Sequence, residues 1–118
     1  MSDYKKLKVW ETAHKFTIDI YKTTKGFPED EKYGLISQIR RSVSSIPTNI
    51  VEGSGQLTRK NYIRFLGMAQ GSAYETEYQI LLAKDLGYLK LDKYNLLNKK
   101  IKDIIYMLFG LIKSLKKS

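Results

Sequence analysis

The 118-residue chain has no cysteine and only one histidine. The lack of cysteine excludes disulfides, thiolate chemistry and cysteine-based zinc or iron–sulfur sites, and it fits a reducing compartment. His14 has no glutamate–histidine pair at ligand spacing around it, so the sequence predicts a packing or surface residue and not a metal ligand. Nothing orients a base for Ser/His/Asp catalysis. We therefore expect no metal, no cofactor and no catalytic residue, so that the protein is not an enzyme.

A long apolar run is missing as well. The longest one, residues 104–112, is far shorter than the roughly 20 residues that a membrane-spanning helix needs. The first residues lead into an amphipathic pattern and not into the apolar core of a signal peptide. We expect no membrane partner and a cytoplasmic location. The length suits one domain, residues 1–118, with a core of its own.

Acidic residues are few: the chain has 12 of them against 21 lysines and arginines, which gives a net charge of +9. The imbalance is greatest from Lys90 onward, where eight lysines accompany two aspartates. A basic chain attracts polyanions, and nucleic acid is the commonest one inside cells. A solvated, lysine-rich helix face explains the same composition, so charge alone suggests a class of partner and no mechanism.

Apolar residues recur at steps of three and four along most of the chain, which predicts amphipathic helices. We expect one helix from residue 7 to about 25, and a second that Asp30 caps and that ends near residues 52–54. A third is capped by Thr58 and closed by Gly87, and Asp92 caps a fourth. The connections are short, and no strand pattern or repeat competes. The sequence therefore predicts an all-α fold, an antiparallel up-down-up-down four-helix bundle.

Pro47 lies inside the apolar stripe of the second helix. Proline has no N–H, and its ring crowds the carbonyl one turn back, so we expect this helix to kink at Pro47. Asn49 and Glu52 share a face just beyond the proline. They could bond the backbone groups that Pro47 frees, or they could form a small polar site.

Arg40 and Arg41 are adjacent in the same helix and therefore point to different faces. The planar guanidinium group suits bidentate pairing with a carboxylate or a phosphate. One interpretation pairs these arginines with Glu52, Glu75 or Glu77 and locks helices or subunits together. The other places them on nucleic-acid phosphates. We favour the first interpretation, because those carboxylates would be costly if they were buried without a partner.

The third helix has a basic beginning and a centre of small residues, 67–73. Each glycine within a helix costs about 1 kcal/mol relative to alanine, so we expect a neighbouring helix to approach closely there. Arg59, Lys60 and Arg64 cluster at the beginning, where the helix dipole favours phosphate. Tyr62 lies among them, but it begins the apolar stripe, which favours a core position.

Two apolar rows run side by side along the fourth helix. The first alternates steps of three and four from Tyr94 to Leu115, as in a coiled coil. The second consists of Ile105, Phe109 and Ile112. A helix buried deep in one bundle would explain both rows. We favour the interpretation that the second row packs against another chain, which predicts a homo-oligomer.

Several segments follow the order and spacing of a known family. They are Leu7–Trp10, Ala13, Ile20–Tyr21, Phe27–Pro28, Tyr33–Leu35, Gln38–Arg41, Ser45–Ile50, Glu52–Gly53, Phe65–Leu66, Ala69–Ser72, Glu75, Glu77 and Leu86–Leu89. On these residues, which cover nearly the whole chain, the sequence resembles the four-helix-bundle proteins encoded in intervening sequences of bacterial 23S rRNA genes.

The resemblance implies a ring-shaped homopentamer of antiparallel four-helix bundles and a nucleic-acid-binding role. A more distant branch of such proteins serves diversity-generating retroelements, where a basic pentamer acts with reverse transcriptase and RNA. This chain resembles the rRNA branch, and it departs from the usual pattern in the bulky residues Tyr74 and Tyr78 and in Val51. The positions that match the motif of the family are Arg40, Arg41, Pro47, Asn49, Glu52, Gly53, Gly71, Ser72, Glu75 and Glu77.

The sequence as a whole predicts a non-enzymatic homo-oligomer, pentameric by resemblance, that binds RNA or another nucleic acid through basic surfaces. An alternative is a protein-interaction scaffold or accessory subunit without direct nucleic-acid binding, in which arginines and glutamates of the motif form subunit contacts. A third hypothesis is an enzyme that uses Asn49, Glu52 and Glu75 around the kink. The candidate phosphate contacts are Arg40, Arg41, Arg59, Lys60 and Arg64.

Overall fold

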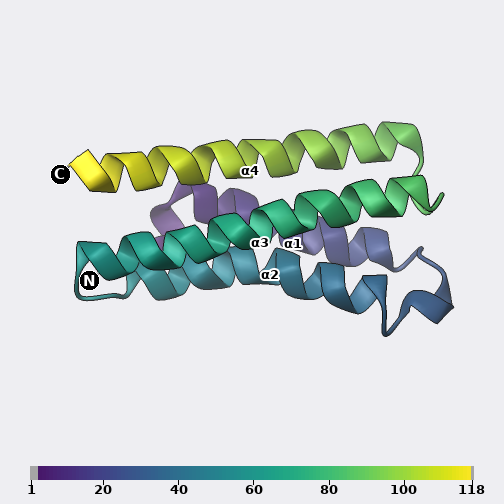
Figure 1. The fold of residues 1–118 in the computed structure, drawn as a ribbon, viewed down its shortest axis with the longest axis horizontal. Coiled ribbons are helices and arrows are strands. Elements are labelled where there is room, and N and C mark those ends of the chain that lie inside the picture. Colours follow the sequence, from purple (N-terminus) through teal and green to yellow (C-terminus); the bar gives the residue numbers. More distant parts are fainter. Residues whose placement is uncertain (1–2, 118) are drawn as a thin grey trace.

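The structure, a computed structural model, describes residues 3–117, and these form four long α-helices with short connections (Figure 1). The helices are α1 (Lys8–Thr24), α2 (Leu35–Ser54), α3 (Arg59–Asp85) and α4 (Leu91–Lys117). Two short 3₁₀ helices, η1 (Tyr4–Lys6) and η2 (Glu29–Glu31), precede α1 and α2 respectively. The described residues contain no strand. The predicted all-α bundle is confirmed.

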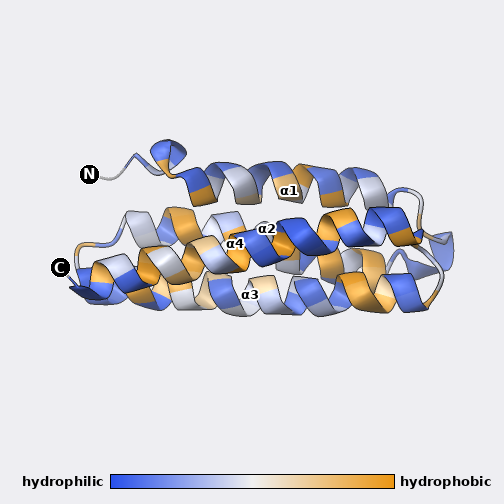
Figure 2. Ribbon diagram, turned by 90° about the horizontal axis from the view of Figure 1, so that it is seen from above, coloured by the Kyte–Doolittle hydropathy of each residue, from blue (hydrophilic) through white to orange (hydrophobic). Residues whose placement is uncertain are grey.

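Contacts between helices give the direction of each one. Thr17 of α1 reaches Val43 of α2, whereas Thr24, farther along α1, reaches Arg40, which comes earlier in α2. In Figure 1 the chain passes back and forth along the long axis, so that both termini and the α2–α3 connection lie at one end. Figure 2 shows α1 and α3 on opposite sides, with α2 and α4 between them.

The core is built from the apolar stripes that the helical period predicts. In α2, Ile39, Val43, Ile46 and Ile50 are at most 1% exposed, and the first row of α4 is buried in the same way from Leu97 to Leu108. Each such side chain contributes about 1.5–3 kcal/mol by its removal from water. Figure 2 shows the consequence for α1, whose hydrophobic segments face the other helices and whose hydrophilic segments face outward.

Pro47 lies within α2, which continues through it to Ser54. Proline leaves the carbonyl of Val43, four residues earlier, without its usual helical donor. That carbonyl receives a substitute from α1, because the Thr17 hydroxyl lies 3.2 Å from Val43 O and 2.8 Å from Ala13 O. The two carbonyls share the single hydroxyl proton. A neighbouring helix thus compensates for the missing bond, and the kink itself stays a prediction.

Two predicted helix starts are wrong. Asp30 lies in η2 and does not cap α2, whose first residue is Leu35. The Leu35 N–H donates to the Glu31 carboxylate instead, at 3.0 Å. Asp92 is the second residue of α4 and not its cap. Local preference for a capping residue did not reveal these shifts, because tertiary packing sets the exact start of a helix.

Two other predicted boundaries are confirmed. Thr58 caps α3 by accepting a hydrogen bond from the Asn61 N–H at 3.1 Å. Gly87 follows α3 with a φ of +84°, a conformation that side chains other than glycine rarely adopt.

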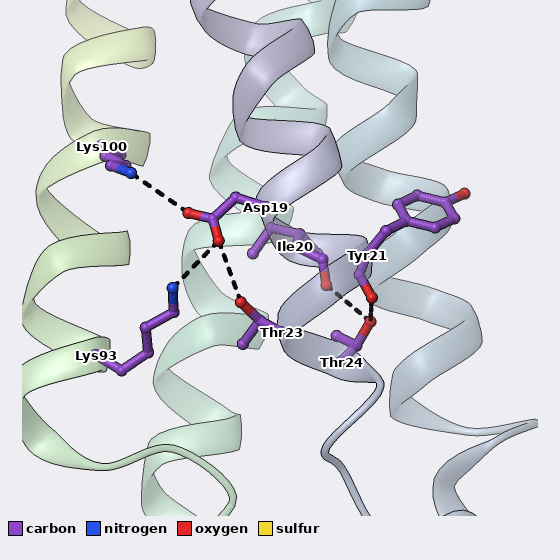
Figure 3. Close-up of polar contacts among 7 residues, drawn as sticks. All are labelled: Asp19, Ile20, Tyr21, Thr23, Thr24, Lys93 and Lys100. Atoms are coloured by element: carbon purple, nitrogen blue, oxygen red, sulfur yellow. Dashed lines mark hydrogen bonds and ion pairs between the residues drawn. The ribbon is translucent and has the colours of Figure 1, made fainter.

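Ion pairs join α1 to α4 on the outside of the bundle. The Asp19 carboxylate lies 3.1 Å from Lys93 Nζ and 3.4 Å from Lys100 Nζ, and it also accepts from the Thr23 hydroxyl (Figure 3). Burial raises the pKa of Asp19, but hydrogen bonds and charge attraction from the two lysines outweigh it, so the pKa is lowered on balance.

None of the helices formed by the described residues is long and apolar enough to cross a membrane.

Candidate functional site

Arg40 binds the C-terminal end of α1. Its Nε donates to the Thr24 hydroxyl at 2.9 Å and its Nη2 donates to the Tyr21 carbonyl at 3.0 Å, while the guanidinium group lies over the Tyr21 ring. A cation at this end of a helix also interacts favourably with the helix dipole. Arg40 is therefore structural within the chain, and its partners there are a hydroxyl and a backbone oxygen and not the expected carboxylate.

Arg41 points away from the bundle. It is exposed, and its guanidinium group forms no ion pair or hydrogen bond with the described residues. Ser45, Thr48 and Glu52 follow it at steps of three and four, so these four residues share one face of α2. Glu52 is exposed as well. Arg41 is thus available to a partner, whereas Arg40 is already bonded to α1.

A polar network fills the interface between α2 and α3. The buried Ser42 hydroxyl donates to Gln79 Oε1 at 2.6 Å and lies 2.8 Å from the Thr76 hydroxyl. Gln79 Nε2 in turn donates to the Glu75 carboxylate at 3.3 Å. Glu75 is therefore tied to the interface, although it is exposed. Glu77 lies on another face of α3, beside Tyr94 of α4, and does not join the network.

Asn49 and Glu52 do not act together. Asn49 is 8% exposed, and its Nδ2 donates to the Ser45 carbonyl at 2.8 Å. The carbonyl that Pro47 frees is that of Val43, and Thr17 satisfies it. The expected bond from Asn49 or Glu52 to a freed backbone group is therefore wrong, and the geometry does not assemble the pair into a polar site.

Gly53 explains how closely α2 and α3 approach. A Cβ atom at this position would lie 2.9 Å from the Phe65 Cβ and 3.0 Å from the Tyr62 ring. No helix of this chain makes the close approach expected at the glycines in the centre of α3, because a Cβ at Gly67 or Gly71 would meet nothing within 4 Å. The helix contact that needs glycine thus uses a residue of α2.

The basic beginning of α3 lies on the surface. Arg59, Lys60 and Arg64 are all exposed, and the Arg64 guanidinium lies over the Phe65 ring. Tyr62 packs against the core as expected, and burial raises its pKa. These three cations lie near the α3 N-terminus, where the helix dipole favours anions.

The five candidate phosphate contacts do not form a single site. Arg41 is adjacent to Ser42, which contacts Thr76, and Thr76 lies 16 residues from Lys60 along α3. At 1.5 Å per residue this separation is roughly 25 Å. Arg40 and Arg41 therefore belong to a different part of the molecule from Arg59, Lys60 and Arg64.

Charge divides the bundle into two halves. We define the basic half as residues 3–15, 46–72 and 105–117, which the antiparallel helices bring to the end that holds both termini (Figure 1). It contains ten lysines and arginines and three acidic residues. We call the remainder of the chain the mixed half, which contains eleven lysines and arginines and nine acidic residues. Seven of the nine net charges thus lie in the basic half.

Sequence reasoning missed this grouping. It recognised the lysines after residue 90 and the cluster at Arg59 separately, and it did not place Lys113, Lys116 and Lys117 beside the start of α3. The signal was present, because an antiparallel arrangement of α3 and α4 necessarily brings the start of one to the end of the other. The charges of the first residues, Lys5, Lys6 and Lys8, join the same end.

Comparisons with known proteins agree with this fold. A family model described as 23S rRNA-intervening sequence protein matches residues 5–110. Among solved structures, the chain is similar to a protein of unknown function from the S23 ribosomal protein family of Bacteroides thetaiotaomicron, with a TM-score of 0.83 and 29% identity. The match covers 89% of this chain and 95% of that one. No curated protein matches the chain.

Proposed function

Since the chain belongs to the 23S rRNA-intervening sequence protein family, we propose that it binds RNA or another nucleic acid through its basic half, without catalysis. The observation that carries the proposal is the concentration of seven of the nine net charges in that half. Lysine and arginine side chains that neutralise phosphates release condensed counterions, which supplies most sequence-independent affinity. The expected location is the cytoplasm, where RNA is abundant.

The proposal includes assembly into a homo-oligomer, a pentamer by the family resemblance. Phe109 is 52% exposed and Ile112 is partly buried, which leaves part of the second apolar row of α4 accessible. Ile105 is 8% exposed and packs in the core of its own chain. Several copies would present several basic halves to one RNA, and linked weak contacts give a higher overall affinity than any single contact.

The test is fluorescence anisotropy of a structured RNA and of a DNA duplex of matched length, at low and at physiological salt. The variant Lys8→Gln/Lys60→Gln/Arg64→Gln removes three exposed cations from the basic half. We expect its affinity for RNA to fall at least tenfold. The slope of log K against log salt should decrease by about 2–3, since each lost phosphate contact contributes about 0.9.

The matched control is Lys22→Gln/Lys25→Gln/Lys90→Gln, which removes three exposed cations from the mixed half and leaves the same net charge. We expect its affinity to stay within about threefold of the unmodified protein, because those cations lie far from the proposed surface. Equal losses in both variants would show that net charge alone attracts RNA. No binding above a control protein of the same charge would overturn the proposal.

A protein-interaction scaffold is the second candidate function. It is favoured by the positions of the motif residues, since Arg40 is engaged within the chain and Glu75 belongs to the α2–α3 network. Residues held in this way set the geometry of a surface and do not contact phosphate. A protein partner whose binding is insensitive to salt, with no RNA recovered, would support this function over the first.

A further inference from the structure

An open groove of about 560 Å³ lies between the first half of α3 and the last turns of α4. Its apolar walls are Ile63 of α3 and Phe109 and Ile112 of α4. Its floor includes Gly67 and Gly71, which lie one turn apart on α3. We call this feature the outer groove. An apolar surface of this kind on a highly charged protein indicates an interaction site.

The two glycines leave the outer groove open. A Cβ atom at Gly67 or Gly71 would meet no atom within 4 Å, so no described part of the chain packs against them. Both positions are exposed, and glycine weakens a helix relative to alanine. The missing side chains bring no benefit inside the chain, but they would allow the backbone of another helix to approach α3 closely.

Gln70 lies between the glycines and lines the same groove. It is 7% exposed, and its Nε2 donates to the Ile105 carbonyl at 3.3 Å. Its Oε1 is buried and has no hydrogen-bond partner among the described residues. A buried acceptor without a donor is costly. Oε1 has almost no accessible surface, so a partner reaches it only if the Gln70 amide turns toward the groove on binding. A hydroxyl or amide side chain of the partner would then satisfy it, and this need is independent of the glycines.

The charges along the outer groove define the occupant further. Lys113, Lys116 and Lys117 line it near the end of α4, no acidic residue lines it, and none of the three forms an ion pair with residues 3–117. From Ile63 to Gly71 the groove spans about 12 Å, which is two turns of a helix. An amphipathic helix would use both the apolar walls and the unbonded Gln70 oxygen, whereas nucleic acid would use only the lysines.

We propose that the outer groove docks an amphipathic helix of a protein partner. The apolar face of that helix lies on the glycine floor, its acidic residues face Lys113, Lys116 and Lys117, and a hydroxyl or amide side chain bonds Gln70 Oε1. The acidic residues fix the direction of the helix, because the lysines line the groove near the end of α4. A helix docked in this groove covers Phe109 and Ile112, so the homo-oligomer of the proposed function would assemble through other surfaces. The site uses none of the proposed nucleic-acid contacts Lys8, Lys60 and Arg64.

The test uses a fluorescein-labelled helical peptide of 16 residues with leucines along one face and glutamates at one end. We expect the unmodified protein to bind it at physiological salt, as measured by anisotropy. Gly71→Leu fills the floor of the groove, so it should weaken binding at least tenfold. Gly110→Leu is the matched control, because Gly110 is equally open but does not line the groove. Its affinity should stay within twofold.

Controls on the peptide and on the assembly decide the remaining possibilities. Equal binding of a scrambled peptide, or of the original peptide by Gly71→Leu, would overturn the proposal. So would binding of dodecanoate but not of the peptide, which would assign the groove to a small amphiphilic anion. Loss of the oligomer in Gly71→Leu, measured by sedimentation, would make the groove a contact between copies of this chain. The proposal is supported if Gly71→Leu loses peptide binding while its RNA binding and oligomer size stay unchanged. That result also separates the proposal from the proposed function.

Discussion

The α2–α3 interface and the outer groove between α3 and α4 use the same residue types in opposite ways. At the first, Gly53 lets α2 and α3 touch, because a Cβ atom at this position would lie only 2.9 Å from the Phe65 Cβ. At the second, Gly67 and Gly71 face open space. The glutamines differ in the same way. In Gln79 both the amide oxygen and the amide nitrogen have a hydrogen-bond partner, whereas in Gln70 the oxygen has none among the described residues.

The contrast shows that a helical glycine has two meanings. A glycine that a neighbour already touches is needed by the fold, and its replacement forces two backbones apart. A glycine that meets nothing weakens the helix without any gain inside the chain, which points to a contact outside it. Sequence alone does not separate these cases, because Gly53, Gly67 and Gly71 all lie within helices and the atoms that do or do not face them come from elsewhere in the fold.

Gly53→Ala should produce the largest effect on stability. The new Cβ would meet the Phe65 Cβ and the Tyr62 ring, so we expect the free energy of unfolding to fall by about 1–3 kcal/mol. Thermal unfolding followed by circular dichroism measures the change, which corresponds to roughly 4 °C per kcal/mol in a chain of this size.

Gly71→Ala is the control in the opposite direction. Its Cβ meets nothing, so we expect a gain of about 0.5–1 kcal/mol from better helix propensity and a less flexible unfolded chain. If both substitutions changed the melting temperature with the same sign, the distinction between the tight interface and the open groove would be lost.

The two glutamines offer a second test, of intermediate size. Gln79→Leu removes the acceptor of the buried Ser42 hydroxyl and the donor to Glu75, so we expect a loss of about 1–2 kcal/mol. Gln70→Leu removes one long hydrogen bond together with an unpartnered oxygen, and we expect a change within about 0.5 kcal/mol. Urea denaturation of the two variants measures the difference. Equal losses would show that Gln70 Oε1 has a partner in the folded protein.

The sequence was sufficient to predict what depends on neighbours along the chain. Amphipathic stripes such as Ile39–Ile50, the Thr58 cap and the Gly87 turn follow from local spacing and preference. Contacts between helices were not predictable in this way. The Thr17 hydroxyl substitutes for the donor that Pro47 lacks, and Arg40 binds the end of α1. Both need the relative register of two helices, which no single stripe contains.

The need to know how helices pair also explains which parts of the candidate site were predictable. Arg59, Lys60 and Arg64 were recognisable as a cluster because they are close in sequence. Their association with Lys113 and Lys116 required the antiparallel pairing of α3 and α4, as did the groove that these lysines border. Arg40 and Arg41 were expected on different faces of α2, but the sequence did not show that the first binds the end of α1 and the second lies in solvent.

The α1–α4 contact provides a reference outside both interfaces, and its loss should cost less than Gly53→Ala or Gln79→Leu. Asp19 accepts from Lys93 and Lys100, and its pKa is lowered in the folded protein. A lowered pKa means that the folded state stabilises the charged form, so the contribution is complete above the unfolded pKa and is lost as the pH falls through the folded one. We expect Asp19→Asn to cost about 0.5–1 kcal/mol at pH 7. The cost should shrink as the pH falls below the unfolded pKa and vanish once the pH is below the lowered folded pKa, where the carboxyl is protonated in both states.

The matched control for Asp19 is Asp103→Asn, which breaks a single exposed pair with Lys99 and should cost only a few tenths of a kcal/mol, as is usual for such pairs on a helix surface. Unfolding curves of the three proteins at several pH values between 2 and 8 measure the difference. Glu31, whose pKa is lowered by the Leu35 N–H and the Tyr88 hydroxyl, remains in all three and sets a common pH dependence. A constant gap between Asp19→Asn and the unmodified protein down to pH 2 would show that the carboxylate charge is not what joins α1 to α4.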